Sequence, residues 1–287
     1  MNFSSDKITS FSETKTLHCG NNVLLMDKPL VMGILNLTPD SFFDGGRYLL
    51  SEAWLAQTEK MIGEGAAIID IGAVSSRPGA KSVSEEEELS RLIPVLSVLV
   101  KRYPATIFSV DTYQAKVAKV SADAGAGIIN DISGGRMDAQ MLETVANTGL
   151  PYILMHMQGV PENMQNNPSY SDVIAEVNLF FKKSIQTLKQ KGIREVIIDP
   201  GFGFGKTIPH NYSLLQNLGS LKQPGYPLLV GISRKSMIYK LLEISPEESL
   251  NATSALQLIA LLKGADILRV HDVKEAVQII KVTGMLG

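Results

Sequence analysis

The sequence predicts an α/β fold, a (β/α)8 TIM barrel that carries a short N-terminal hairpin. Eight short apolar runs recur along the 287 residues, and they are nearly continuous in Ile, Val and Leu instead of alternating with polar residues. Such runs are typical of strands that are buried on both faces of a parallel sheet. Helical patterns separate the runs, and eight alternating strands and helices in about 250 residues fit a (β/α)8 barrel. A doubly wound sheet is the alternative, but it usually has fewer strands and longer crossovers.

Each apolar run ends in a polar cluster, and several runs follow a glycine that suits the C-terminus of a helix. The expected strands are residues 30–37, 67–73, 107–112, 127–133, 152–157, 195–201, 227–233 and 265–272. The glycines are Gly65, Gly125, Gly149, Gly192 and Gly264.

Two helices are indicated by their first residues. Ser84 is followed three residues later by a glutamate, which is the spacing of a capping box, and an apolar stripe with helical spacing comes next. Pro94 lies inside that stripe and predicts a kink. The acidic residues 85–88 are expected to form a solvated first turn that favours the helix dipole, in preference to a cation site. Asp172 opens the second helix, and Gly192 ends it.

The residues before the first run do not fit the repeat. Residues 16–27, with a Gly-Asn-Asn turn in the middle, indicate a small hairpin, which we expect to cap the bottom of the barrel. No linker or low-complexity segment interrupts the chain. Residues 1–287 are therefore expected to form one domain.

Composition excludes several classes of protein. Lys and Arg number 27 and Asp and Glu number 29, so the net charge is −2 and nucleic acid is not an expected partner. The polar N-terminus has no apolar region of a secretory signal, and no apolar run approaches about 18 residues. We therefore expect no membrane association and a cytoplasmic location. The single cysteine, Cys19, rules out an internal disulfide and is expected to be a small, partly buried apolar residue.

Residues 198–207, IDPGFGFGKT, end like a phosphate-binding loop of nucleotide-binding proteins. That loop needs a glycine five residues before Gly205, where this sequence has Pro200. Proline removes one of the N–H donors on which such a loop depends. The segment is therefore not expected to bind a nucleotide, and Lys206 is expected to be a solvated loop residue.

Polar residues follow or end all eight runs, and the active site of a (β/α)8 barrel lies at these strand ends. They are Asn36, Asp70, Asp111, Asn130, Asp131, His156, Asp199, Arg234, Lys235, Arg269 and His271. Charges beside a barrel core are costly unless they are paired. Some of these groups are therefore expected to bind a ligand.

The candidate residues divide into two chemistries. One group suits phosphate oxygens and offers a hard oxygen ligand for Mg²⁺ at Asn36. Its members are Asn36, Arg77, Arg269 and His271. The other group mixes donors and acceptors, as a flat heterocycle with amino and carbonyl edges requires. Its members are Asp111, Asn130, Asp199 and Lys235. The glycines at 201, 203 and 205 are expected to let the backbone approach a planar ring.

Structural roles compete with these interpretations. Asp111 could instead cap the helix that begins near Tyr113. Asp70 and Asp131 are interpreted as structural, either as caps or as partners of neighbouring strand ends. His156 is expected to be a packed, hydrogen-bonded residue at the barrel rim, because the four histidines show no zinc-site spacing.

Eight segments in order resemble the dihydropteroate synthases, a pterin-binding family of folate biosynthesis. They are GILNLTPDSFFDGG (33–46), SSRPGA (75–80), SVDT (109–112), NDISG (130–134), LMHMQG (154–159), IDPGFGFGK (198–206), GISRKSM (231–237) and RVHDV (269–273). The resemblance runs from about residue 24 to the C-terminus. It implies a homodimeric enzyme that joins 4-aminobenzoate to 6-hydroxymethyl-7,8-dihydropterin diphosphate and releases diphosphate.

The resemblance also implies roles for individual residues. The pterin would be held by Asp111, Asn130, Asp199 and Lys235. Asn36 would hold Mg²⁺ and diphosphate, and the diphosphate would be held further by Arg77, Arg269 and His271. The 4-aminobenzoate pocket would be completed by two mobile loops and two neighbouring residues. The loop residues are Thr38, Pro39, Phe42 and Ser76, and the two neighbouring residues are Phe204 and Ser236.

The second loop departs from the family's common Glu-Ser-Thr-Arg-Pro, since it reads Val74-Ser75-Ser76-Arg77-Pro78. Ser76 keeps a hydroxyl but loses a methyl group, and Val74 removes a carboxylate that could affect loop closure. The reaction would be SN1-like, with a pterin-stabilised cation formed as the diphosphate charge is neutralised. A pterin-binding methyltransferase and a non-catalytic pterin-binding paralogue are the alternatives.

Overall fold

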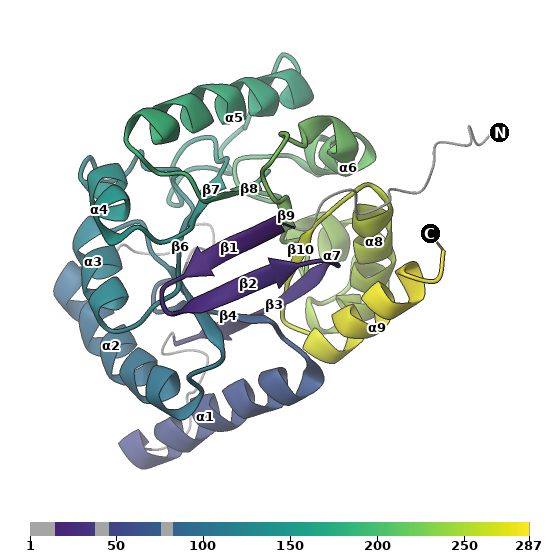
Figure 1. The fold of residues 1–287 in the computed structure, drawn as a ribbon. Helices are drawn as coiled ribbons and strands as arrows, with labels where there is room; N and C mark the ends of the chain where they lie inside the picture. Colours follow the sequence, from purple (N-terminus) through teal and green to yellow (C-terminus); the bar gives the residue numbers. More distant parts are fainter. Residues whose placement is uncertain (1–14, 38–45, 76–82, 287) are drawn as a thin grey trace.

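Eight parallel strands form the barrel in the computed structural model (Figure 1). The structure describes residues 15–37, 46–75 and 83–286, and for residues 46–52 it describes the backbone alone. Within these ranges the strands are β3 (Leu30–Asn36), β4 (Ile68–Gly72), β5 (Ile107–Asp111), β6 (Ile128–Asp131), β7 (Tyr152–Met155), β8 (Val196–Asp199), β9 (Leu229–Val230) and β10 (Ile267–Val270). Their order is β8-β7-β6-β5-β4-β3-β10-β9, and a parallel bridge between Ile198 and Leu228 closes the ring. The predicted (β/α)8 barrel is confirmed, with strands slightly shorter than the apolar runs.

Helices surround the barrel and lie between successive strands (Figure 1). They are α1 (Gly46–Glu64), α2 (Glu85–Arg102), α3 (Ala115–Asp123), α4 (Met141–Thr148), α5 (Val173–Gln190), α6 (Ile208–Gln216), α7 (Ser236–Leu242), α8 (Leu250–Leu262) and α9 (Val273–Thr283). Short 3₁₀ turns at Leu218–Leu221 and Glu247–Ser249 complete the connections.

The predicted helix starts are confirmed by their caps. The Ser84 hydroxyl accepts a hydrogen bond from the Glu87 N–H at 3.2 Å. One Asp172 carboxylate oxygen accepts bonds from two N–H groups in the first turn of α5, at 2.9 and 3.0 Å.

Glu88 corrects the prediction of a fully solvated acidic turn. Its side chain is buried with 1% exposure, and its carboxylate accepts a hydrogen bond from the Gln114 amide. The first turn of α2 packs against the turn between β5 and α3, so that the fourth glutamate of the run faces inward. Burial raises the pKa of Glu88.

The N-terminal hairpin consists of β1 (Lys15–Cys19) and β2 (Asn22–Met26), which pair antiparallel and cross the end of the barrel (Figure 1). Alternate hairpin residues are buried, and they form one apolar cluster with the first residues of the barrel strands. The cluster contains Leu17, Cys19, Leu24, Met26, Leu30, Met32, Ile68, Ile107, Ile128, Ile153, Ile197, Leu229 and Ile267. The barrel interior at this end is therefore filled by apolar side chains.

Cys19 lies in this cluster with 2% exposure and forms no disulfide, as its sequence context predicts. Burial raises the pKa of its thiol to about 12, so it stays protonated. No helix in the described part of the chain is long and apolar enough to cross a membrane.

Candidate active site

Arg269 lies at the centre of the polar end of the barrel, where it bridges two carboxylates. Its Nε donates to Asp70 Oδ2 at 2.6 Å, and its Nη2 donates to Asp111 Oδ2 at 2.9 Å. The Asn130 amide nitrogen donates to the same Asp70 oxygen at 2.9 Å. Side chains from β10, β4, β5 and β6 are thereby joined in one network, although 199 residues separate Asp70 from Arg269.

Strand register brings these groups to one level. Asn36 pairs with Gly72, Gly72 pairs with Asp111, and Asp111 pairs with Asn130. A Cβ atom on Gly72 would lie 3.8 Å from both Asn36 Oδ1 and Asp111 Oδ2. The glycine therefore leaves space between two oxygen donors at the mouth of the barrel.

Asp199 and Lys235 form the other side of the mouth. Asp199 is 6% exposed, and its Oδ1 accepts a hydrogen bond from the Gly201 N–H at 2.7 Å. The Lys235 ammonium donates to the Phe202 carbonyl and lies 4.8 Å from the centre of the Phe204 ring. The mouth therefore presents a carboxylate, an ammonium group and an aromatic face together.

Burial shifts the acid–base properties of these groups. It lowers the pKa of Lys235 to about 8, although the Asp199 carboxylate opposes that change. Burial also raises the pKa of Asp199, with Lys235 opposing, and it raises the pKa of Asp111 against the effect of Arg269. Clustered groups with shifted pKa values are typical of functional sites.

His271 stands at the exposed edge of the same mouth. Its Nδ1 lies 3.1 Å from the Ser233 hydroxyl, which also accepts a bond from the His271 main-chain N–H at 3.2 Å. This arrangement leaves the hydroxyl proton for Nδ1 and favours a ring proton on Nε2. Crowding by protein atoms and then the Arg269 charge lower the pKa of His271 to about 4, so the ring is neutral near pH 7.

The glycines of the β8–α6 segment have a different role from the one predicted. A Cβ atom on Gly201 would overlap the His156 carbonyl oxygen, and one on Gly205 would overlap the Gln158 carbonyl oxygen. Glycine is needed at these two positions because the main chain after β7 lies directly against them. Only Gly203 faces a side chain of the site, since a Cβ atom at that position would lie 3.3 Å from Lys235 Cδ.

Lys206 is buried with 2% exposure, so its prediction as a solvated residue is wrong. Its ammonium turns inward and donates to the carbonyls of His156, Gly201 and Phe204, at 3.2, 2.9 and 3.0 Å. Thr207 then caps α6, because its hydroxyl accepts from the His210 N–H at 3.3 Å. The Gly-Lys-Thr sequence is thus accounted for by contacts within the protein.

Asp70 and Asp131 pair with neighbouring groups, as predicted. Asp131 accepts hydrogen bonds from the Tyr152 hydroxyl at 2.7 Å and from the N–H groups of Ser133 and Gly135. Asp70, however, also pairs with Arg269 at the centre of the site. The sequence predicts only a structural role for Asp70 and does not predict this contact. The clue is an acidic residue inside the apolar run IIDIG, where a buried charge needs a partner.

Two further interpretations are settled by the geometry. Asp111 does not cap a helix, because α3 begins at Ala115 and its cap residue is Gln114. His156 is packed as predicted, with ring centres 6.1 Å from Tyr170 and 5.0 Å from Phe180. Its Nδ1 is buried without a hydrogen-bond partner among the described residues, so the predicted hydrogen bonding fails at that atom.

Two of the remaining predicted residues lie beside Lys235. Ser236 begins α7 directly after Lys235, and Phe204 lies beside the Lys235 ammonium. Five predicted residues lie outside the described part of the chain: Thr38, Pro39, Phe42, Ser76 and Arg77.

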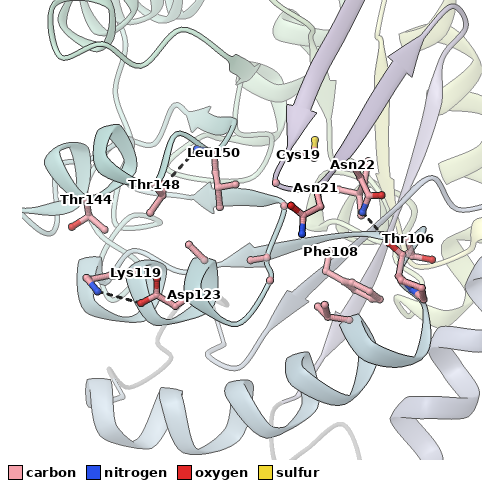
Figure 2. Close-up of a pocket in the computed structure, with 18 of the residues that line it drawn as sticks. Cys19, Asn21, Asn22, Thr106, Phe108, Lys119, Asp123, Thr144, Thr148 and Leu150 are labelled. Atoms are coloured by element: carbon pink, nitrogen blue, oxygen red, sulfur yellow. Dashed lines mark hydrogen bonds and ion pairs between the residues drawn. The ribbon is translucent and has the colours of Figure 1, made fainter.

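A cavity of about 590 Å³ lies at the other end of the molecule, beside the turn of the hairpin (Figure 2). Lys119 and Asp123 line it and pair with each other at 3.2 Å, and the Asn22 amide donates to the Pro104 carbonyl. The cavity lies where barrel strands begin, whereas catalytic groups of such barrels lie where strands end. We therefore place the active site at the mouth that contains Arg269.

Comparisons with known proteins identify the family to which the chain belongs. Residues 32–271 match the family described as pterin binding enzymes. A dihydropteroate synthase of Escherichia coli K12 is 50% identical over 259 residues, which cover 90% of this chain and 91% of that protein. A dihydropteroate synthase of Haemophilus influenzae is 46% identical over 268 residues, covering 93% and 97%.

Solved structures give the same result. The Yersinia pestis dihydropteroate synthase in complex with a sulfonamide drug superposes with a TM-score of 0.89 at 45% identity, covering 94% of this chain and 98% of that one. The Xanthomonas albilineans enzyme in complex with 7,8-dihydropteroate gives 0.84 at 40% identity, with the same coverage. Since sequence identity and barrel geometry agree over nearly the whole length, this chain belongs to the dihydropteroate synthase family of pterin-binding enzymes.

Proposed function

We propose that this barrel mouth joins 4-aminobenzoate to 6-hydroxymethyl-7,8-dihydropterin diphosphate, with release of diphosphate and formation of 7,8-dihydropteroate. The observation that carries the proposal is the convergence of the predicted pterin residues with Arg269 at one mouth. The two alternatives, a pterin-binding methyltransferase and a non-catalytic paralogue, are not favoured, because the relatives described above are dihydropteroate synthases.

The pterin ring fits the groups on the Asp199 side of the mouth. Asp199 uses one oxygen for the Gly201 N–H and keeps acceptor capacity for the amino-pyrimidinone edge. Asn130 on β6 and Asp111 on β5 offer amide and carboxylate groups, and the Lys235 ammonium can reach a carbonyl or ring nitrogen. Buried, prepositioned groups of this kind fix the orientation of a planar ligand.

The diphosphate fits between Asn36, Arg269 and His271. The positive charge of Arg269 is already paired with the carboxylates of Asp70 and Asp111. An incoming diphosphate therefore needs further positive charge, which Arg77 and a divalent cation would supply.

Magnesium fits the donors at this edge of the mouth. Asn36 Oδ1 is a hard oxygen donor beside the space that Gly72 leaves, and Mg²⁺ commonly binds through one or two protein oxygens and substrate phosphates. The described residues include no cluster of three or more His, Cys, Asp or Glu that could hold a metal alone. Bound Mg²⁺ would add positive charge to the diphosphate oxygens.

The protein's own groups favour departure of the diphosphate before attack by the amine. The bond between the exocyclic CH₂ and the diphosphate oxygen breaks, both electrons leave with the oxygen, and the pterin stabilises the resulting cation. Arg269 and the Nε2–H of His271 stabilise the charge on the leaving oxygen. The amine of 4-aminobenzoate, a weak nucleophile held nearby, then bonds to the CH₂ carbon and loses a proton.

Diphosphate release tests the proposed reaction directly. With pterin diphosphate and Mg²⁺, we expect rapid release when 4-aminobenzoate is present, one dihydropteroate for each diphosphate, and strong inhibition by a chelator that excess Mg²⁺ reverses. Absence of release under all conditions would indicate a non-catalytic protein. Full activity in the presence of the chelator would show that the reaction does not require magnesium.

His271 predicts proton uptake when diphosphate binds. Without a bound anion, the pKa of the His271 ring is lowered to about 4, so the ring is neutral at pH 6. A bound anion would raise that pKa and favour the protonated form. Calorimetry at pH 6 in two buffers of different ionisation enthalpy should show net proton uptake that His271→Gln largely abolishes. Equal uptake in both proteins would assign the proton to another group.

We also propose that the protein is a homodimer that uses α7 and α8. Large apolar side chains are exposed on these two helices: Leu241, Leu242, Ile259 and Leu262. Exposed apolar patches of this kind are typical of interfaces. The cytoplasmic location stays a prediction.

Sedimentation tests the dimer. The wild-type protein should sediment with twice the mass of one chain, and the double substitution Leu241→Glu and Leu242→Glu should give monomers. Leu179→Glu on α5 changes an equally exposed apolar side chain and should leave the mass unchanged. Dimers in the double variant would place the interface elsewhere.

A further inference from the structure

Lys206 is an unusual cation, because it is buried among main-chain carbonyl groups and, within the described part of the chain, forms no ion pair with a carboxylate. Its three hydrogen bonds go to His156, Gly201 and Phe204, which account for all three N–H bonds of an ammonium group. A neutral amine could donate to only two of the three carbonyls. As an ammonium group, Lys206 therefore uses its whole donor capacity within the protein.

The three carbonyls belong to two segments that lie against each other. Gly201 and Phe204 follow β8, and His156 follows β7. A Cβ on Gly201 would overlap the His156 oxygen, so the two main chains are in direct contact at this point. Converging carbonyl oxygens repel one another when water is excluded, and a buried cation between them removes that repulsion.

The same contacts lead directly to the pterin side of the mouth. The His156 residue that accepts from Lys206 also donates its N–H to the Asp199 carbonyl at 2.9 Å. Gly201, whose carbonyl accepts from Lys206, donates its own N–H to the Asp199 carboxylate at 2.7 Å. Lys206 therefore holds both neighbours that fix Asp199.

Other side chains hold the rest of this segment. The Gly205 carbonyl accepts from the Tyr170 hydroxyl at 2.8 Å, and the Gly203 N–H donates to Asn211 at 2.7 Å. The Phe202 carbonyl accepts from Lys235. Among these described contacts, only Lys206 joins the carbonyls of Gly201 and Phe204 to the segment after β7. We therefore expect its loss to affect the positions of Asp199 and Phe204 together.

We infer that Lys206 is a positioning residue, whose ammonium takes the place of a bound cation between the segments after β7 and β8 and sets Asp199 and Phe204 for the pterin and 4-aminobenzoate. The inference rests on the proposed pterin site. Burial opposes the charge on Lys206 and lowers its pKa, whereas the Asp199 carboxylate favours the charge and raises the pKa relative to burial alone.

Binding of the two halves of the substrate tests this role. In Lys206→Met, we expect 6-hydroxymethylpterin to bind at least tenfold more weakly, and diphosphate with Mg²⁺ to bind within twofold of wild type. Retained diphosphate binding shows that the variant is folded, and selective loss of pterin is not expected of a general loss of stability. Lys206→Gln keeps two N–H donors and should fold with an intermediate loss of pterin affinity.

Two matched variants complete the experiment. Lys15→Met removes a lysine that donates to the Tyr226 carbonyl and Asp266 at the far end of the barrel, and it should leave both affinities unchanged. Asp199→Asn should lose pterin binding if the proposed site is right. Unchanged affinities in both Lys206 variants, or equal losses of pterin and diphosphate, would overturn the role of Lys206. Unchanged pterin binding in Asp199→Asn would instead overturn the pterin site itself.

Discussion

The ion pair that Arg269 makes with Asp70 and Asp111 determines the rest of the site. Asp70 has no exposure to solvent, and removal of one partner from a buried pair commonly costs about 3–5 kcal/mol. The guanidinium therefore has one strongly favoured position, which is also fixed by the Asn130 bond to Asp70. Asp111, Asn130 and Arg269 are placed for a ligand before the ligand arrives, which reduces the ordering cost of binding.

The barrel makes this ion pair possible. Asp70 and Arg269 are distant in sequence, and only a closed sheet in which β10, β3, β4 and β5 are adjacent brings them together. The hairpin fills the opposite end of the barrel with apolar side chains, and the network around Arg269 lies at the other end. On the far side of the mouth, carbonyls held by Lys206 and Lys235 give Asp199 a comparably fixed environment.

The fold and most of the site can be predicted from the sequence because their signals are local. Continuous apolar runs identify parallel strands, and the residues that end them, such as Asp111, Asn130 and Asp199, are placed at the mouth by topology alone. Contacts between distant segments cannot be predicted in this way. The burial of Lys206 has no local signal because its three carbonyl partners converge from two segments, and Gly201 is glycine because of a main chain that follows a different strand. The central place of Asp70 escapes prediction for the same reason, since its partner lies on the last strand of the barrel.

A double-mutant cycle between Asp70→Asn and Arg269→Lys tests the central ion pair most directly. The measured quantity is kcat/KM for pterin diphosphate at saturating 4-aminobenzoate in the wild type, the two single variants and the double variant. If Arg269 acts from the position that Asp70 gives it, the double variant should lose about as much as the more damaged single variant. Losses that simply multiply in the double variant would show that the two residues act independently and would contradict the account.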